Sequence, residues 1–330
     1  MTIDTPEELE RSFRDSELAG GTEPGIARRR LLPGSALNVF TEVRFPSHEW
    51  ALVVQSEERL EDRDLVLASG LLCRTRNGCV EVVARQETDR RLFCTLLADL
   101  VRQLTVPSPT PTAALTRRLA SWQRMLGQGL PTGLSPEARI GLYGELLVLR
   151  EIIIPALGPL ALRAWTGPSG ASQDFVHGSV ALEVKTVSRR HAEHCRISSE
   201  HQLDSTGLSD LFLVHQVVAG APEGSSLCDL VDELRCTPAV QVELAWFENC
   251  LLESGWLDAH REQYVNDRHT VVRRQCLAVA DGFPRVTPLE LPAGVSAVSY
   301  LVDLSTCTSH RVEESKVQHI IGAGHDLDEG

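Results

Sequence analysis

Lysine is rare in this chain, which carries 32 Lys and Arg residues of which only Lys185 and Lys316 are lysine. Arginine presents a rigid fork with a fixed charge, whereas lysine is a compact cation whose pKa can move, so the two are not interchangeable at a reactive site. Lys185 lies in the segment LEVKTV, two residues after Glu183, and the segment QDF places Asp174 shortly before it. These residue types at this spacing suit metal-assisted hydrolysis of a phosphodiester bond.

A β-hairpin would bring these side chains together. If His177-Gly178 forms a two-residue turn, Asp174 lies opposite Ala181. Glu183 then points to the same side at a diagonal distance of about 7 Å, and Lys185 continues along that face. Two carboxylates in a largely apolar strand repel each other unless they share a proton or bind a cation. The pattern therefore predicts a cation site, with the lysine positioned to hold the attacking water.

Oxygen-rich sites of this kind suit Mg²⁺, and Mn²⁺ is expected to substitute for it. We expect Asp174, Glu183 and the backbone carbonyl of Val184 to bind the ion. A helix predicted over residues 136–154, with Ser135 as its N-cap, supplies a third acid, because Glu145 falls in the apolar stripe of that helix. Glu145 would complete the outer shell of the metal or hold a second ion.

Two glycines flank this acid in the predicted helix. Gly141 and Gly144 each cost the helix about 1 kcal/mol relative to alanine, a cost that is tolerable where another backbone must approach closely. The sequence therefore predicts that the helix is pressed onto a neighbouring element beside Glu145.

Each of these residues also has an ordinary structural explanation. Glu-x-Lys is common on solvated strand faces, an Asp beside a turn often shapes that turn, and Glu145 could pair with an arginine across a helix interface. Arg189 and Arg190 either contact phosphate or lie in a solvated loop. The segment His191-x-x-His194-Cys195 contains zinc-binding residue types but no fourth ligand at a zinc-finger spacing, so we interpret it as a solvated turn.

The composition is that of an ordinary globular protein. The 330 residues are enough for about two domains, with 42% hydrophobic and 23% charged residues and a net charge of −13. Nine scattered cysteines without a C-x-x-C pair favour reduced thiols over disulfides or a zinc ribbon. The N-terminal segment lacks the features of a signal peptide, and no apolar run is long enough to cross a membrane. We expect a soluble, cytoplasmic protein with no membrane partner.

The chain is predicted to consist of five regions. Polar composition without apolar periodicity predicts a loosely ordered lead-in over residues 1–36. Short strands followed by a closing helix predict a β-rich domain over 37–106, and the Pro-rich segment 107–112 resembles a linker. Helices alternating with strands over 113–310 indicate an α/β domain, and residues 311–330 are predicted to form a polar acidic tail.

Three segments, GLYGELLVL, QDF and LEVKTV, occur in helix–strand–strand order and resemble the PD-(D/E)XK nuclease superfamily, the fold of many restriction endonucleases. Most of residues 40–305 resembles a bacterial PD-(D/E)XK motif protein family. Genes of that family lie in restriction and phage-defence clusters beside Z1-type helicase, MutL-like ATPase and methyltransferase genes. The wider resemblance includes WTGP at 165–168, ISSEHQL, the Ser-Leu start of the predicted helix near 225, GFPRV and LPAGVSAVSYLVDL.

The resemblance implies an α/β fold with a restriction-endonuclease-like core, in which helices flank a mixed central sheet, and an N-terminal β-rich domain. Asp174 and Glu183 match the metal-binding acids of the superfamily, Lys185 the catalytic lysine, and Glu145 the acid on the helix. Gln202 matches a polar position that contacts substrate or the attacking water, although capping a short turn is an equal alternative.

The expected function is therefore Mg²⁺-dependent hydrolysis of DNA within a restriction or phage-defence system. The alternative is a non-catalytic subunit that uses the same fold to dock DNA or to scaffold an ATPase. The resemblance implies DNA and the helicase, MutL-like ATPase or methyltransferase of the same cluster as partners, and a homodimer is left open. No P-loop, dinucleotide-binding or nucleophile-elbow motif is present, which argues against an ATPase or a serine hydrolase.

Overall fold

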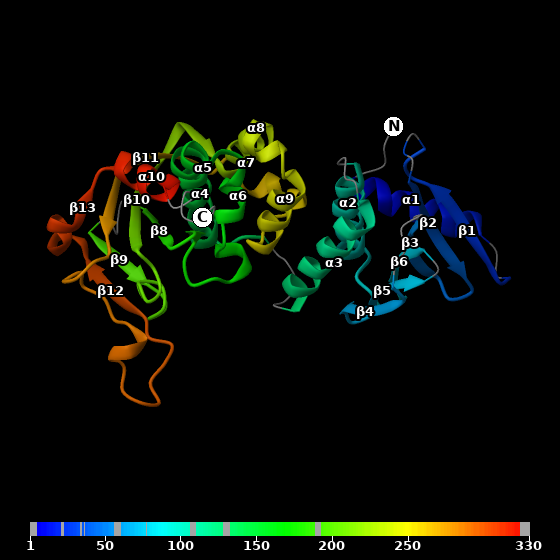
Figure 1. Cartoon of the computed structure of the whole chain (residues 1–330). Helices are drawn as coiled ribbons and strands as arrows, with labels where there is room; N and C mark the ends of the chain where they lie inside the picture. The colour runs from blue at the N-terminus through cyan, green and yellow to red at the C-terminus, as the bar shows by residue number, and fades with distance from the viewer. Residues whose placement is uncertain are drawn as a thin grey trace. The chain divides into compact units, whose positions relative to one another are not determined.

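The computed structural model describes residues 5–20, 23–33, 35, 37–55, 61–76, 78–105, 110–127, 133–188 and 193–323 (Figure 1). The chain forms two compact units, Met1–Thr132 and Gly133–Gly330. Within the described residues, every helix is too short or too polar to cross a bilayer.

The first unit is built on a six-stranded antiparallel sheet with the strand order β1-β2-β3-β6-β5-β4. Three helices pack with it, and their apolar side chains cover the buried face of the central strands. The elements are α1 (Pro6–Ala19), β1 (Gly25–Arg30), β2 (Asn38–Phe45), β3 (Glu49–Gln55), β4 (Arg63–Ala68), β5 (Leu71–Arg76), β6 (Cys79–Ala84), α2 (Arg90–Thr105) and α3 (Pro111–Gly127).

The prediction of a loosely ordered lead-in over 1–36 is wrong for the described part of that segment. Thr5 caps α1 by accepting a hydrogen bond from the Glu8 backbone N–H at 3.2 Å, and Leu9 and Phe13 are buried one helical turn apart. The Phe13 ring stacks on Trp50 with the ring centroids 4.5 Å apart. A narrow apolar stripe in a polar helix therefore suffices for docking, because its partners lie elsewhere in the chain.

The predicted linker at 107–112 also differs from the structure. Helix α3 begins at Pro111 and belongs to the first unit, where Trp122 Nε1 donates to Asp99 Oδ2 at 2.7 Å and Arg118 Nε donates to the same oxygen at 2.7 Å. The division between the units therefore lies after α3, between Thr132 and Gly133. Proline at the first position of a helix is favourable, so Pro111 starts this helix rather than extending a linker.

The second unit is built on a mixed five-stranded sheet with the order β13-β11-β10-β8-β7. Strands β8 and β10 are parallel, and the other neighbouring pairs are antiparallel. The elements are α4 (Pro136–Val148), α5 (Ile154–Leu157), α6 (Ala161–Ala164), β7 (Phe175–His177), β8 (Val180–Ser188), β9 (His194–Ile197), β10 (Asp210–Ser226), α7 (Leu227–Cys236), α8 (Pro238–Gln241), α9 (Leu244–Glu253), β11 (Arg268–Ala278), β12 (Tyr300–Asp303), β13 (Arg311–Val312) and α10 (Glu314–Ala323).

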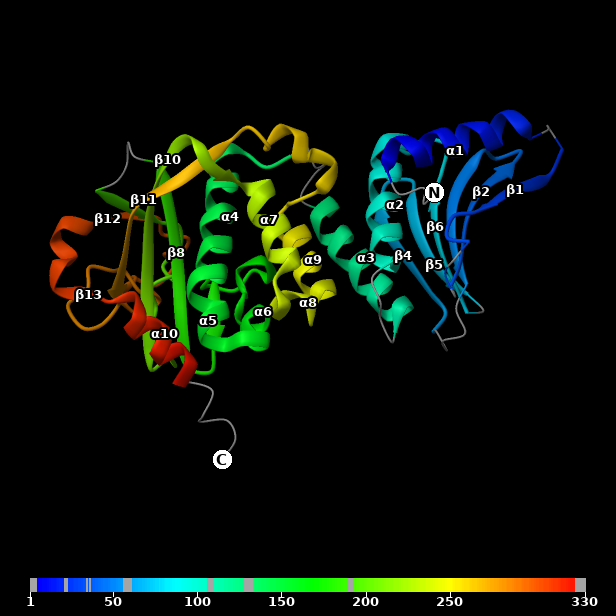
Figure 2. The ribbon, with the colours of Figure 1, turned by 90° about the horizontal axis from the view of Figure 1, so that it is seen from above.

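Both faces of this sheet are covered. Helices α4, α7 and α9 lie on one side of β8, β10 and β11 (Figure 2), where Leu182 and Val184 join the larger core. The short β9–β12 pair lies over the other face, where Ala181 and Leu213 join a second core. The α/β class with helices beside a mixed sheet, together with the β-rich N-terminal region, confirms the predicted fold class.

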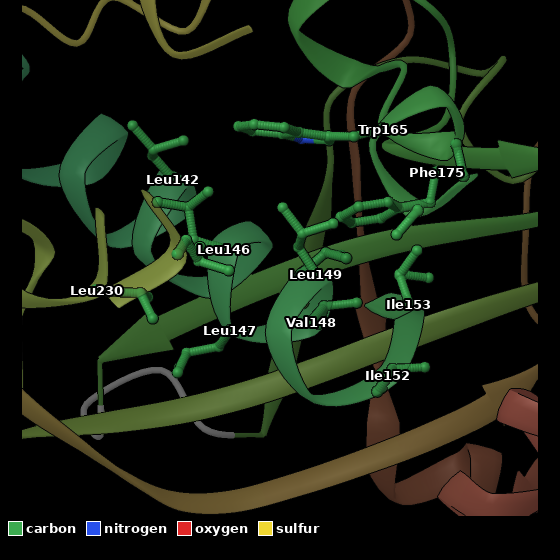
Figure 3. Close-up of a cluster of buried hydrophobic side chains, with 14 of the residues drawn as sticks. Leu142, Leu146, Leu147, Val148, Leu149, Ile152, Ile153, Trp165, Phe175 and Leu230 are labelled. Atoms are coloured by element: carbon green, nitrogen blue, oxygen red, sulfur yellow. The ribbon is translucent and has the colours of Figure 1, made fainter. Parts of the chain in front are cut away.

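Helix α4 carries the centre of the larger core. Ser135 caps it by accepting a hydrogen bond from the Ala138 backbone N–H at 3.2 Å, and Pro136 is its first residue. The predicted helix over 136–154 is continuous, although residues Leu149–Ile153 form a π-helical turn before α5. In Figure 3 the apolar side chains of this stretch gather beside those of Trp165 and Phe175.

The prediction of a polar tail over 311–330 is wrong for the described part of that segment. The chain from Arg311 to Ala323 is folded onto the second unit. Strand β13 pairs with β11, and α10 buries Val317 and Ile321, which are four residues apart on one helical face. Two apolar residues at this spacing are enough to dock a short helix whose other positions are polar.

Candidate active site

Asp174 and Glu183 meet across the β7–β8 hairpin. The pairs His177↔Val180 and Phe175↔Leu182 show that the turn is Gly178-Ser179 rather than His177-Gly178. Gly178 has a φ of +56°, which glycine adopts without steric cost. Continuing this register by one residue places Asp174 opposite Glu183 instead of Ala181. The predicted side of the strand is retained, because moving the turn by one residue shifts each pairing by two.

A backbone hydrogen bond fixes the carboxylate of Asp174. The Val184 N–H donates to Asp174 Oδ2 at 2.7 Å, so the Asp174 side chain is held against strand β8. The backbone carbonyl of Asp174 is fixed separately, because it accepts hydrogen bonds from the N–H groups of Thr166 and Gly167 at 2.9 Å each.

Lys185 contacts both Glu183 and Gln202. Its Nζ lies 2.7 Å from Glu183 Oε1 in an ion pair and donates to Gln202 Oε1 at 3.1 Å. The same Gln202 oxygen accepts the backbone N–H of Ser198 at 2.8 Å. Gln202 therefore caps a turn, one of the two roles weighed from the sequence, and also anchors the lysine. Its contact with substrate or the attacking water stays a prediction.

Glu145 is the third acid near this hairpin. Its Oε2 accepts a hydrogen bond from Trp165 Nε1 at 2.9 Å. Helix α4 is pressed onto β8 beside it, since a β-carbon on Gly144 would overlap the Thr186 side chain. Gly141 has open space around it, so the predicted close approach is confirmed for Gly144 and wrong for Gly141.

The three acids hold their protons more tightly than free carboxylic acids. Burial raises the pKa of Glu145 to about 8, and the charge of Asp174 acts in the same direction against the Trp165 hydrogen bond and the Lys185 charge. Burial also raises the pKa of Asp174, against the opposing effect of the Val184 N–H. The pKa of Glu183 is raised well above its usual value by burial and by the charge of Asp174.

Lys185 remains a cation in this environment. Burial alone would lower its pKa, but the charge and hydrogen bond of Glu183 together with the charge of Asp174 outweigh burial, so the pKa of Lys185 is raised. One positive side chain thus lies among three acids whose charged forms are disfavoured, an arrangement that occurs at functional sites more often than elsewhere.

A family model described as "Putative PD-(D/E)XK family member, (DUF4420)" matches residues 7–305. The chain belongs to this family. No curated protein and no solved structure matches it significantly. The family description indicates a nuclease-like PD-(D/E)XK fold.

The residues that match the PD-(D/E)XK motif are brought together in one place. Asp174 and Glu183 lie on one hairpin, Lys185 touches Glu183, and Glu145 interacts electrostatically with Asp174 and Lys185. The backbone N–H of Val184 donates to Asp174, while metal binding by the Val184 carbonyl stays a prediction. Arg189 and Arg190 lie outside the described residues.

PD-(D/E)XK nucleases generally use Mg²⁺, and the acids present here fit such an ion. Among the described residues, no group of three or more His, Cys, Asp or Glu side chains forms a complete set of metal ligands. Mg²⁺ does not need one, because it is usually bound through one or two carboxylates and keeps several waters. The fit rests on Glu183, which is 1% exposed, whose Oε1 pairs with Lys185 and whose Oε2 accepts no hydrogen bond from the described residues.

The zinc alternative does not fit the structure. His194 and Cys195 are neighbours in strand β9, whose side chains alternate between exposed and buried, so they point to opposite sides and cannot share one ion. His191 lies outside the described residues.

Two further residues contact this site, and the sequence did not assign a role to either. Trp165 reaches Glu145 through its indole N–H, and Gln173 Nε2 donates to the His201 carbonyl at 2.9 Å, which ties the hairpin to the segment that carries Gln202. The family resemblance of the WTGP segment at 165–168 singled out Trp165. A sequence motif alone does not reveal which side chain the tryptophan contacts.

Proposed function

We propose that this protein is a Mg²⁺-dependent DNA endonuclease that hydrolyses phosphodiester bonds, as a component of a bacterial restriction or phage-defence system. The observation that carries the proposal is the hairpin on which Asp174 and Glu183 face each other, both with raised pKa values, while Lys185 pairs with Glu183. Carboxylates that have only one positive side chain to offset their charges favour the binding of a divalent cation.

The side chains divide the work of hydrolysis between them. Asp174 and Glu183 would hold the ion, with Glu145 in its outer shell or at a second ion. A divalent ion supplies positive charge that stabilises the charge developing on the phosphodiester oxygens and favours ionisation of the attacking water. Lys185 Nζ, kept charged and held by Gln202, is positioned to orient that water by hydrogen bonding.

Cleavage of supercoiled plasmid DNA with Mg²⁺ and with EDTA tests this proposal. We expect cleavage by the wild type with Mg²⁺ only, and a loss of at least about 100-fold in Asp174→Asn and in Lys185→Ala. Lys316→Ala is the matched control, because it removes the other lysine, which is exposed on α10, and should cleave as the wild type does.

Equal cleavage by wild type, Asp174→Asn and Lys185→Ala would contradict the proposed site. DNA binding that is unchanged in Asp174→Asn, without metal-dependent cleavage by any of these proteins, would instead favour the non-catalytic DNA-docking or scaffolding subunit. The helicase, MutL-like ATPase or methyltransferase of the same gene cluster would then be added to the assay as partners.

A further inference from the structure

A short turn between α6 and β7 touches two of the acids at once. Trp165 donates its indole N–H to Glu145 Oε2 at 2.9 Å. The ring itself is 2% exposed and packs beside Phe247, with the ring centroids 6.1 Å apart. Because the indole is locked by this packing, its N–H has a fixed direction, and the Glu145 carboxylate is held where that N–H points.

The next two residues of the turn hold the other acid. The backbone N–H groups of Thr166 and Gly167 both donate to the Asp174 carbonyl at 2.9 Å. Together with the Val184 N–H on Asp174 Oδ2, they fix the main chain and the side chain of Asp174 from two directions. Donors on the protein backbone cost no side-chain entropy, so this is a rigid form of support.

Gly167 provides the space in which the two carboxylates lie. A β-carbon at this position would be too close to Asp174, at 2.9 Å from Oδ1 and 3.2 Å from Cα, and in ordinary contact with Glu145 Oε2 at 3.5 Å. The backbone of Gly167 is not in the left-handed region, so an alanine could adopt its conformation without strain. Glycine is therefore needed here for space beside the acids and not for its backbone freedom.

We propose that the turn Trp165–Gly167 is a positioning clamp that sets the places of Glu145 and Asp174 and thereby the affinity of the acid cluster for a divalent cation. Trp165 and Gly167 are positioning residues, since they act through the acids. The proposal rests on the proposed function only in its choice of ligand.

Mn²⁺ binding to the full-length protein, measured by titration calorimetry, tests the clamp without relying on cleavage. We expect Trp165→Phe and Gly167→Ala to bind Mn²⁺ at least about tenfold more weakly than the wild type, as for other residues that orient metal ligands. Wild-type affinity in both variants would overturn the proposal.

Two matched controls separate positioning from general damage. Trp256→Phe also removes a buried indole that donates to a carboxylate, that of Asp258 at 3.2 Å, and Gly141→Ala adds a methyl group to open space. Both controls should bind Mn²⁺ within about twofold of the wild type, and weakening as large as in the clamp variants would overturn the proposal.

The indole ¹H–¹⁵N resonance of Trp165, assigned by its loss in Trp165→Phe, gives a readout that needs no metal. We expect this resonance to move in Glu145→Gln and in Gly167→Ala and to stay in place in Gly141→Ala. If the wild type binds no Mn²⁺, the proposed metal site fails, while the clamp is still decided by this resonance. A Trp165 indole resonance whose position is unchanged in both Glu145→Gln and Gly167→Ala would overturn the proposed clamp.

Discussion

Gln202 shows how much a single amide oxygen can contribute at the scale of one residue. It accepts one hydrogen bond from a charged lysine and one from a backbone N–H, so the turn that positions the glutamine also positions Lys185. A lysine has a flexible stem and loses considerable rotamer freedom when it is fixed. The anchor therefore matters for the place of the ammonium group as well as for its charge.

We predict that Gln202→Ala slows metal-dependent DNA cleavage by about tenfold or more, because Lys185 is no longer held in place. The loss of two hydrogen bonds should also cost about 1–3 kcal/mol of stability, measured by denaturant unfolding. Gln202→Glu, which keeps an oxygen at this position, should retain more of the cleavage rate. An alanine variant that cleaves at the wild-type rate would show that Gln202 has a structural role alone.

The raised pKa of Glu145 predicts how stability changes with pH in the absence of metal. In the unfolded chain Glu145 loses its proton near its usual pKa of 4.5, whereas the folded protein keeps this proton up to about pH 8. Between these values the folded state binds more protons than the unfolded state, so stability falls as pH rises and levels off above about pH 8. The raised pKa values of Asp174 and Glu183 act with the same sign.

Thermal unfolding in EDTA at intervals from pH 5 to pH 8 measures this effect. We expect the midpoint temperature of Glu145→Gln to fall less steeply than that of the wild type. Groups such as His215, whose pKa is lowered to about 4 by burial, contribute equally to both proteins and cancel in the comparison. Parallel curves for the two proteins would contradict the raised pKa of Glu145.

At the scale of elements, the contact between α4 and β8 decides where Glu145 lies. We predict that Gly144→Ala destabilises the protein by about 1–3 kcal/mol, because its methyl group would overlap Thr186 in a packed interface. Gly141→Ala, three residues earlier in the same helix, should be neutral or stabilising by up to about 1 kcal/mol, since alanine favours helix and has room there. Equal effects of the two substitutions on denaturant unfolding would contradict this packing.

The sequence sufficed for the elements whose patterns are local. The helix around Glu145 and the hairpin that carries Asp174 and Glu183 follow from residue periodicity and turn residues, whereas the mixed sheet was implied by the family resemblance. The turn was predicted one residue too early, but the predicted side of the strand for Asp174 is still correct. A shift of the turn by one residue moves each pairing by two, and strand side chains alternate with a period of two.

Local residue patterns could not predict the contacts between segments that lie far apart in the sequence. The burial of Leu9 and Phe13 in α1 depends on partners such as Trp50, and nothing in the local sequence identifies them. The Trp165–Glu145 hydrogen bond likewise joins residues twenty positions apart across an irregular turn. The Gly-Ser turn was recognisable in principle, because Gly-Ser is a known two-residue hairpin signal.

At the scale of the whole chain, the C-terminal helix α10 is part of the second unit. We predict that a chain ending at Glu313 is less stable than one ending at Ala323 by roughly 3–6 kcal/mol, because it no longer buries Val317 and Ile321. Denaturant unfolding of the two truncated chains measures the difference. Equal stability would show that α10 contributes little to the core.

The net charge of −13 places a further condition on a DNA enzyme. Phosphate binding is favoured by clustered cations and weakened by salt, so the acidic chain alone should bind DNA weakly. A divalent ion at the acids, Arg189 and Arg190, or a basic partner would have to supply the attraction.

The hairpin and the helix that carry the acids also bear on how the site forms during folding. Glu145, Trp165, Asp174, Glu183 and Lys185 all lie within residues 145–185, so their mutual contacts close short loops, and contacts of low sequence separation form fast. Gln202 joins by a contact of the same kind, because its bond to Lys185 spans 17 positions and the bond from Trp165 to Glu145 spans 20. The acids, the lysine and its anchor should therefore assemble from one stretch of chain, so that residues 145–202 form the site as a single local unit.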